Sequence, residues 1–156
     1  MHKVTIYTDG ACKGNPGPSG WAYCLIMSNS PDKYAIRSGC INQGTNNIAE
    51  LTAVIEALSA LKYSCIVDLY SDSMYVINGC TDWLNKWRKN GYVNSKKRTI
   101  ENVELWKKID YLMSKHSIKF HYVKGHSGDR LNDLVDTHAS NACDQVSLVN
   151  IRNVHG

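Results

Sequence analysis

Three acidic residues of this chain, Asp9, Glu50 and Asp72, lie inside or directly after segments that are otherwise strongly apolar. Taken singly, each has an ordinary structural use: Asp9 in a turn, Glu50 as a favourable charge near a helix start, and Asp72 as a helix cap. Carboxylates that converge repel one another unless a cation neutralises them, and such hard oxygen ligands suit Mg²⁺ or Mn²⁺. If the three carboxylates converge, they therefore predict a divalent metal site. Whether they converge depends on the strands and the helix that carry them.

The strands expected before Asp9 and Asp72 can bring these two side chains together. Val4–Thr8 alternates in hydrophobicity, and Ile66–Tyr70 has the composition of a short buried strand. A helix between them would form a right-handed crossover between parallel neighbours, which lie about 5 Å apart. Because sites in open α/β sheets lie beyond the carboxyl ends of the strands, both aspartates are expected at one edge.

The connecting helix carries the third acid. Apolar residues recur three and four positions apart from Asn46 to Lys62, which is the period of an amphipathic helix, and Thr45 is a suitable N-cap. Glu50 lies in the first turns of this helix among apolar neighbours. Its carboxylate either extends outward to water or points into a polar site at the end of the sheet.

The remaining pattern predicts an α/β protein with one mixed sheet. Further strands are expected at Trp21–Met27, Tyr34–Ile41 and Ile118–Val123, and further helices at Met74–Asn78, Trp83–Lys89, Val103–Met113 and Leu131–Cys143, the last opened by Asp129 and Asn132. Gly79 and Gly91 are expected to break the helical segments, and the stretch up to Thr99 is expected to lack regular structure. The order indicates a five-stranded mixed sheet, three antiparallel strands first, with helices packed on it. The tail from Gln145 is assigned neither to the core nor to a frayed end.

Length and composition indicate one soluble domain. The chain has 156 residues, of which 43% are hydrophobic and 21% charged, and it contains no apolar run long enough for a transmembrane helix. The N-terminus lacks the apolar core of a signal peptide, so no membrane association and a cytoplasmic location are expected. The six cysteines are interpreted mainly as buried thiols, although their even number leaves a disulfide framework open. A zinc site is disfavoured because no local Cys/His quartet has the required spacing.

One segment of the chain concentrates positive charge. The net charge is +4, and no acidic residue lies between Asp82 and Glu101. The basic residues of this interval are Lys86, Arg88, Lys89, Lys96, Lys97 and Arg98. On composition alone, a solvated face and a phosphate-contacting patch are equally favoured.

Four motifs, in order along the chain, resemble those of type 1 ribonuclease H. They are DGACKGNPGP at 9–18, GTNNIAEL at 44–51, YSDSMYV at 70–76 and VKGHSG at 123–128, and the match spans nearly the whole chain. The resemblance implies the ribonuclease H-like fold, with a catalytic domain over residues 1–144, a C-terminal tail at 145–156 and a monomeric state. It further implies an endonuclease that cuts the RNA strand of RNA–DNA hybrids and leaves 5′-phosphate and 3′-hydroxyl ends.

The resemblance also implies a ligand set for metal ions. The residues that match the family's four metal-binding carboxylates are Asp9, Glu50, Asp72 and Asp136. Asp136 is preferred to Asp129 and Asp133 because it stands ten residues after His126, although Val135 replaces the usual small residue before it. Two Mg²⁺ ions are implied, with Mn²⁺ as a substitute, and His126 would serve proton transfer or product release. Two such ions, about 4 Å apart, can hold the attacking water and the leaving oxygen of a phosphodiester.

Contacts to both strands of a hybrid follow from the same resemblance. On the RNA strand, whose 2′-hydroxyls distinguish it from DNA, the matching residues are Asn15, Asn47 and Met74 at the bases, and the main chain near Cys12, Gly14 and Asn46 at the 2′-hydroxyls. On the DNA strand they are Thr45 and Asn102 for a phosphate, and Tyr75 and Trp87 for a deoxyribose. Lys96, Lys97 and Arg98 belong to a segment that resembles the family's basic protrusion. Gln43 stands where many members have an arginine, and Trp83 and Trp106 are interpreted as core residues.

Two other functions compete with this interpretation. A junction resolvase or a transposase core would share clustered carboxylates, but not the motifs at 9–18 and 44–51 together. A non-catalytic module that binds hybrids would bind phosphates better without four acids at the site. Cleavage restricted to the RNA strand of a hybrid would separate the three.

Overall fold

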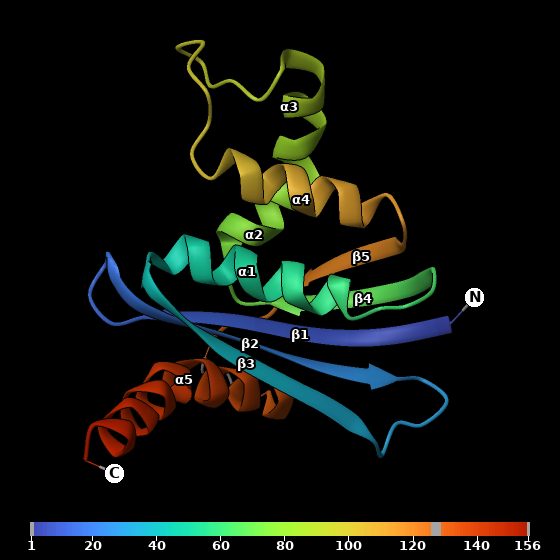
Figure 1. Ribbon diagram of the computed structural model, residues 1–156. Helices are drawn as coiled ribbons and strands as arrows, with labels where there is room; N and C mark the ends of the chain where they lie inside the picture. Colours follow the sequence, from blue (N-terminus) through green and yellow to red (C-terminus); the bar gives the residue numbers. More distant parts are fainter. Residues whose placement is uncertain (1, 126–128, 156) are drawn as a thin grey trace.

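The computed structural model describes residues 2–125 and 129–155, with side chains described up to residue 144, and its centre is one five-stranded sheet (Figure 1). The strands are β1 (His2–Cys12), β2 (Gly17–Met27), β3 (Tyr34–Gly44), β4 (Cys65–Ser71) and β5 (Ser117–Tyr122). Their order across the sheet is β3-β2-β1-β4-β5. The first three strands are antiparallel, and β4 and β5 continue the sheet in parallel to β1. The predicted mixed sheet is confirmed.

Helices cover both faces of this sheet (Figure 1). On one face lie α1 (Asn46–Ser59), α2 (Met74–Asn78), the π-helical turn η1 (Gly79–Trp83), α3 (Leu84–Asn90) and α4 (Val103–Met113). The other face is covered by α5 (Arg130–His155), which packs against β1, β2 and β3. The larger core lies between the sheet, α1 and α4 and includes Ile6, Leu51, Val54, Leu69 and Trp106. A smaller core beneath α5 contains Tyr7, Ala22, Cys24, Val135 and Ala139.

Strand β1 is longer than predicted, and this changes the position of Asp9. The parallel pairing of β1 with β4 ends at Thr8 and Ser71, but the antiparallel pairing with β2 continues through Asp9 to Cys12. Asp9 therefore lies inside the strand rather than after it. The alternating pattern that predicts the strand ends at Thr8, whereas pairing with β2 holds Asp9 to Cys12 in an extended conformation.

The helical segment after β4 does not break at Gly79, contrary to the prediction. α2, η1 and α3 follow one another without interruption from Met74 to Asn90. A Cβ atom at residue 79 would lie 2.0 Å from Cη2 of Trp106, so the glycine allows the helix to approach this buried ring. The predicted break at Gly91 is confirmed, because α3 ends there with φ at 81°. The N-cap of α1 is also confirmed: the hydroxyl of Thr45 accepts a hydrogen bond from the Ile48 N–H at 3.1 Å.

The basic segment after α3 has more structure than predicted. Val93 and Thr99 form an antiparallel bridge, and the side-chain oxygen of Asn94 accepts hydrogen bonds from the N–H groups of Lys96 and Arg98. The segment 93–99, named here the basic loop, is therefore a closed turn. The Asn94 side chain makes two of the hydrogen bonds that close it, which hydrophobic periodicity could not reveal.

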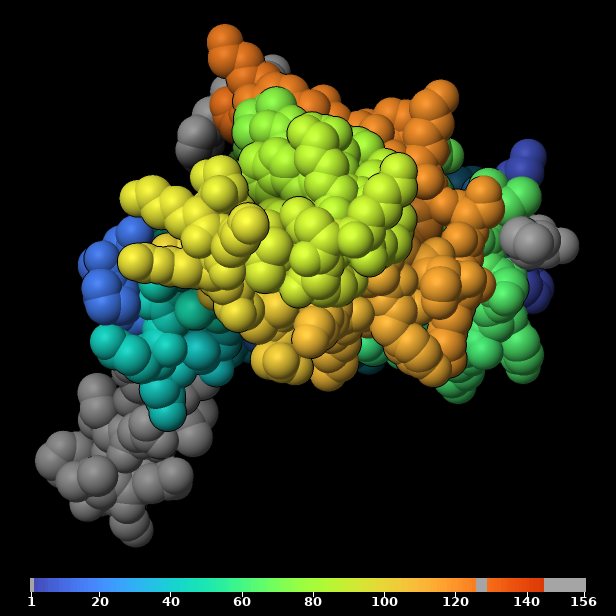
Figure 2. Space-filling view, turned by 90° about the horizontal axis from the view of Figure 1, so that it is seen from above, coloured from blue at the N-terminus to red at the C-terminus, as the bar shows by residue number. Residues whose placement is uncertain are grey.

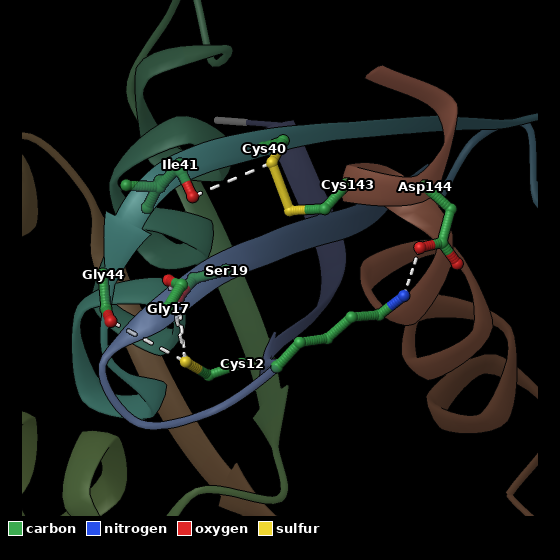
Figure 3. The surroundings of a disulfide bond; sticks show 9 residues. Cys12, Gly17, Ser19, Cys40, Ile41, Gly44, Cys143 and Asp144 are labelled. Carbon is green, nitrogen blue, oxygen red and sulfur yellow. Dashed lines mark hydrogen bonds and ion pairs between the residues drawn. A yellow bond between two sulfur atoms is a disulfide. The ribbon is translucent and has the colours of Figure 1, made fainter. Parts of the chain in front are cut away.

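A disulfide joins α5 to the edge strand β3 (Figure 3). It links Cys40 to Cys143 across a sequence separation of 103 residues, so the interpretation as a buried thiol is wrong for Cys40. Cys24, Cys65 and Cys80 are buried free thiols, as predicted. The next residue of α5, Asp144, forms an ion pair with Lys13 of the β1–β2 loop. These two links fasten α5 to the sheet.

Candidate active site

The three acids that the sequence singled out form one cluster. A carboxylate oxygen from each of Asp9, Glu50 and Asp72 lies within 4.8 Å of the other two. Asp9 comes from β1, Glu50 from the first turns of α1, and Asp72 follows β4 directly. Asp9 is 2% exposed and Glu50 8% exposed, so the cluster reaches into the protein rather than lying on its surface. The predicted convergence of the three acids is confirmed, and it lies where the parallel pairing of β1 with β4 ends.

Gly10 makes the close approach of α1 to β1 possible. A Cβ atom at this position would lie 2.5 Å from the backbone nitrogen of Glu50, which no side chain could accommodate. The Gly10 N–H also donates to Oδ1 of Asp9 at 2.9 Å and to Oε1 of Glu50 at 3.0 Å. One backbone amide therefore orients two carboxylates of the cluster.

The remaining oxygens of these two residues lack a protein donor. Oδ2 of Asp9 and Oε2 of Glu50 are buried, and neither accepts a hydrogen bond from the described part of the chain. Burial first, and then the charges of Glu50 and Asp72, raise the pKa of Asp9 far above the usual range of a carboxyl group. Burial likewise raises the pKa of Glu50. Buried oxygens without donors, in a cluster that resists ionisation, fit a site for a divalent cation, which would favour the charged form of every member.

The fourth predicted ligand, Asp136, reaches the same cluster from α5. Asp136 adds to the raised pKa of Asp9, after burial and the charges of Glu50 and Asp72, and the charge of Asp136 raises the pKa of Glu50. Val135, the unusual neighbour, is fully buried in the small core beneath α5, where its size is used for packing. Asp129 instead caps the helix, because its Oδ1 accepts from the N–H groups of Leu131 and Asn132.

Capping does not account for Asp72. The N-cap of α2 is Ser73, whose hydroxyl accepts a hydrogen bond from the Val76 N–H at 3.2 Å. Asp72 therefore belongs to the cluster by its geometry and is not a helix cap that lies nearby.

His126, the predicted residue for proton transfer or product release, lies outside the described residues.

The residues predicted to contact a substrate fall into two groups and one separate loop. In the first group, the side-chain oxygen of Asn15, in the loop between β1 and β2, accepts a hydrogen bond from the Asn46 N–H at the start of α1, at 3.1 Å. Cys12 and Gly14 lie on the same segment as Asn15, and Thr45 and Asn47 lie beside Asn46. Met74 opens α2 and is 47% exposed. In the second group, the hydroxyl of Tyr75 accepts from Nδ2 of Asn102, and Trp87 meets Trp106 edge to face with ring centroids 5.3 Å apart. Lys96, Lys97 and Arg98 lie apart from both groups, in the basic loop.

Sequence reasoning missed one polar partner inside the second group. Trp106 is fully buried, as predicted, but its indole N–H also donates to the Tyr75 hydroxyl at 3.0 Å. Asn102, the other donor to this hydroxyl, has a left-handed conformation with φ at 57°. An asparagine directly before an amphipathic helix was the available signal, because asparagine tolerates this conformation better than most residues.

Sheet topology and carboxylates together define the class of the protein. It is an α/β protein whose central strands β1 and β4 carry, where their parallel pairing ends, an acidic site that fits divalent cations. Within the described residues, no helix combines the length and the hydrophobicity required to span a membrane.

Comparison with known proteins gives the family. The RNase H family model matches residues 1–144. Ribonuclease H of Legionella pneumophila (strain Lens) is 51% identical over 145 residues, which cover 93% of this chain and 99% of that protein. Ribonuclease H of Wolbachia pipientis wMel is 48% identical over 141 residues, with coverages of 90% and 94%. The chain therefore belongs to the ribonuclease H family, and it is a nuclease.

Solved structures agree with this fold. A type 1 RNase H with the type 2 active-site motif is similar with a TM-score of 0.80 at 26% identity, over 93% of this chain and 74% of that one. A foamy viral protease–reverse transcriptase, solved in complex with an RNA/DNA hybrid, matches 90% of this chain with 20% of its own length, at a TM-score of 0.76 and 24% identity. The latter likeness concerns the fold alone.

The raised pKa of Asp9 predicts a stability that depends on pH when divalent cations are absent. Because this pKa is higher in the folded protein than in the unfolded chain, the folded state retains a proton that the unfolded chain releases above about pH 4. The free energy of unfolding should therefore fall as the pH rises from about 5 to 8, by at most about 1.4 kcal/mol per pH unit for each of the two carboxyls whose pKa is raised, Asp9 and Glu50. Asp9→Asn should flatten this fall and stabilise the protein at the upper end. Urea unfolding in EDTA at several pH values measures both effects.

A control and a second condition make this test specific. Asp32→Asn changes an exposed acid outside the cluster and should leave the fall intact. Added Mg²⁺ should stabilise the native protein most at high pH, because binding to the folded state alone raises the free energy of unfolding. A pH dependence that is equally steep in Asp9→Asn would contradict the role given to this carboxyl.

Proposed function

We propose that this nuclease is an endoribonuclease that hydrolyses the RNA strand of RNA–DNA hybrids and leaves 5′-phosphate and 3′-hydroxyl ends. The observation that carries the proposal is the buried cluster of Asp9, Glu50 and Asp72, with Asp136 beside it, in a chain of the ribonuclease H family. A module that only binds hybrids would gain nothing from buried acids that face phosphates.

The same four carboxylates would hold two Mg²⁺ ions, or Mn²⁺ in their place. When bound, such ions lower the pKa of a water molecule and offset the charge that develops on phosphorus. The chain's own contribution is the orientation of the ligands: the Gly10 N–H directs one oxygen each of Asp9 and Glu50, which leaves their other oxygens for a cation. His126 would carry protons or assist product release.

Strand selection would come from the two groups of polar and aromatic residues. Asn15, Asn47 and Met74, with the main chain near Cys12, Gly14 and Asn46, would contact the RNA strand, where 2′-hydroxyls are the distinguishing feature. Thr45, Asn102, Tyr75 and Trp87 would contact the DNA strand. Figures 1 and 2 support one continuous surface, because the loop after α3 (yellow) and the ends of β1 and β3 (blue and teal) lie toward the same side of the molecule.

A panel of labelled substrates tests the proposal. RNA–DNA hybrid, duplex DNA, duplex RNA and a four-way junction are each incubated with Mg²⁺, Mn²⁺ or EDTA. The expected result is cleavage of the hybrid's RNA strand alone, in the presence of either metal and not in EDTA, with product ends identified by their sensitivity to phosphatase and ligase. Cutting of the junction, or binding of the hybrid without cleavage, would overturn the proposal.

Charge on the basic loop predicts a salt-dependent contribution to hybrid binding. Lys96, Lys97 and Arg98 are exposed, and their replacement by glutamine should weaken binding and reduce the slope of log KM against log salt by about two to three. The measurement is KM at several KCl concentrations. A control variant with Lys3, Lys33 and Lys119 replaced removes the same charge from other exposed positions and should keep the slope. Equal slopes in the two variants would show that the basic loop makes no specific phosphate contact.

A further inference from the structure

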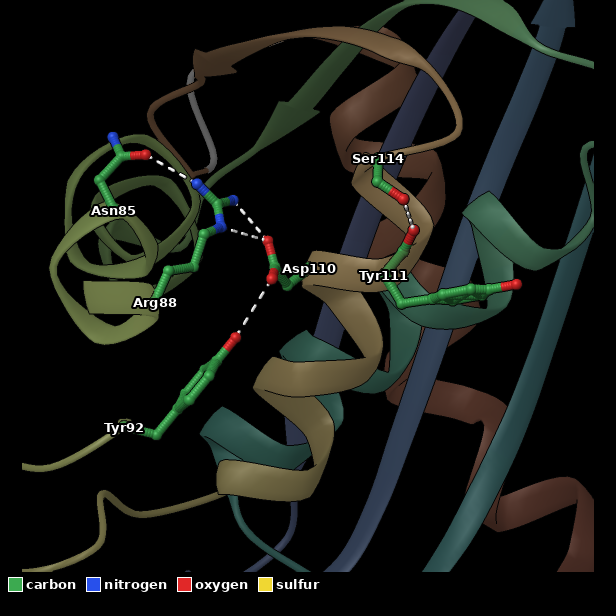
Figure 4. A network of polar contacts seen from close by, with 6 residues as sticks. All are labelled: Asn85, Arg88, Tyr92, Asp110, Tyr111 and Ser114. Atoms are coloured by element: carbon green, nitrogen blue, oxygen red, sulfur yellow. Dashed lines mark hydrogen bonds and ion pairs between the residues drawn. The ribbon is translucent and has the colours of Figure 1, made fainter. Parts of the chain in front are cut away.

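Asp110 of α4 is the centre of a polar network that the sequence did not indicate (Figure 4). Its Oδ1 accepts from Nε of Arg88 at 2.6 Å and pairs with Nη2 of the same residue at 2.5 Å. Its Oδ2 accepts from the Tyr92 hydroxyl at 3.2 Å. Nη1 of Arg88 donates to the side chain of Asn85, one turn earlier in α3, at 2.8 Å. One carboxylate of α4 therefore holds both α3, through Arg88, and Tyr92 beyond the end of α3.

Tyr92 transmits this connection to the basic loop. Its carbonyl oxygen accepts a hydrogen bond from the Ile100 N–H at 3.1 Å, so Tyr92 and Ile100 close the loop at its base. Its backbone nitrogen and that of Gly91 both donate to the Trp87 carbonyl, which fixes the exit from α3. The ring of Tyr92 also lies 5.5 Å below the Lys107 ammonium of α4. The base of the loop is thus held on α4 by a hydroxyl and by a ring.

The basic loop itself is a preformed unit. Asn94 N–H donates to the Arg98 carbonyl at 2.8 Å, and the Asn94 side chain accepts from two further N–H groups inside the loop. Because the loop is internally closed, the direction of its three cations is set at the base, where Tyr92 meets Asp110. Lys96, Lys97 and Arg98 are exposed, and none of them pairs with a carboxylate in the part of the chain that the structure describes.

Arg88 differs from these three cations. Its charge is matched by Asp110, whose side chain is only 25% exposed, so the pair is less screened by water than a pair on the open surface. An arginine held on two sides, by a carboxylate and an amide, has fewer donors to offer a phosphate. In this network Arg88 therefore helps to orient the basic loop rather than to bind a ligand.

We propose that Asp110 is a positioning residue for hybrid binding: through Arg88 and Tyr92 it holds the basic loop in the orientation that meets the nucleic-acid backbone. The inference rests on the proposed function, since it names a determinant of substrate affinity for the same site. Asp110 contacts neither the carboxylate cluster nor the basic loop itself, so its effect should appear in KM and not in kcat.

Two variants and one matched control test this role. Asp110→Asn keeps the shape of the side chain and removes its charge, and Tyr92→Phe removes only the hydroxyl. Each should raise KM for the hybrid about fivefold, the size of a coupling between neighbouring residues, with kcat unchanged. The slope of log KM against log salt should fall by about one, because the loop contacts the backbone less often. Glu104→Gln removes the same charge from an exposed position on the same helix and should leave KM and slope as in the native protein.

A readout without substrate separates this inference from the proposed function. Amide hydrogen exchange at residues 93–99 should be faster in Asp110→Asn and Tyr92→Phe than in Glu104→Gln, while exchange in β1 and β4 stays slow. Unchanged exchange in the loop, or a KM equal to that of Glu104→Gln, would overturn the positioning role while the native protein still cuts hybrid. A lower KM in Asp110→Asn would also overturn the positioning role, because it would mean that Asp110 normally keeps Arg88 from contacting a phosphate. If Asp110→Asn proves unstable on heating, Tyr92→Phe decides by the same measurements.

Discussion

Asp72→Asn should reduce the hydrolysis of hybrid by about a thousandfold or more, with no loss of fold. The carboxylate belongs to a cluster whose oxygens lie within 4.8 Å of one another, and the substitution removes its charge at almost constant volume. Metal ions contribute several kcal/mol of charge stabilisation to a transition state, and about 4 kcal/mol corresponds to this factor in rate. The cap of α2 should survive, because Ser73 provides it. The measurement is kcat with saturating Mg²⁺, together with thermal unfolding.

The control for this result is Asp68→Asn. Asp68 lies on β4, the strand that Asp72 follows, but it pairs with His121 rather than with the cluster. Its replacement should leave kcat within a factor of two of the native value, which is the scatter expected for an uninvolved surface residue. Mg²⁺ should raise the unfolding temperature of Asp68→Asn as it does for the native protein, and less so for Asp72→Asn. Residual activity of Asp72→Asn within tenfold of the native enzyme would remove Asp72 from the metal site.

Reduction of the disulfide should lower the free energy of unfolding by about 4 kcal/mol. The link between Cys40 and Cys143 spans 103 residues, and the loop-entropy model gives its largest stabilisation to loops of such length. It also fastens α5, the helix that brings Asp136 to the cluster, to the edge of the sheet. Urea unfolding with and without dithiothreitol measures the difference.

A double variant makes the result interpretable. Cys40→Ser combined with Cys143→Ser should unfold like the reduced native protein and should not respond to dithiothreitol, while Cys24, Cys65 and Cys80 remain as buried thiols. Alkylation of all six cysteines in unreduced, denatured protein, or an equal response of both proteins to dithiothreitol, would contradict the assigned link.

The carboxylate cluster was accessible to sequence reasoning because it depends on a few general rules. Two strands joined by a helix lie parallel, and residues at their carboxyl ends meet at one edge. The prediction survived an error in the length of β1, because pairing with β4 still ends at Thr8, next to Asp9. Glu50 could point either way from its helix, and the close approach of Gly10 to α1 decided that it points inward.

Other features depended on side chains that meet from distant parts of the chain. Gly79 resembles a helix breaker in the sequence, yet the ring of Trp106 occupies the space beside it and the helix continues. Cys40 and Cys143 have no spacing that marks them as partners. Arg88, in a run of basic residues, has the local pattern of a phosphate contact, and only α4 shows that its charge is matched by Asp110.

The sequence by itself determined the mixed sheet, the crossover helix and the gathering of acids beside the central strands. Periodicity and turn residues report how each element is buried along its own length, and general rules of chain connection then bring the ends of neighbouring strands together. Tertiary structure alone decided the disulfide, the unbroken helix at Gly79 and the network around Asp110. Each of these results from the relative placement of elements, where the shape and charge of one element set the role of a residue on another.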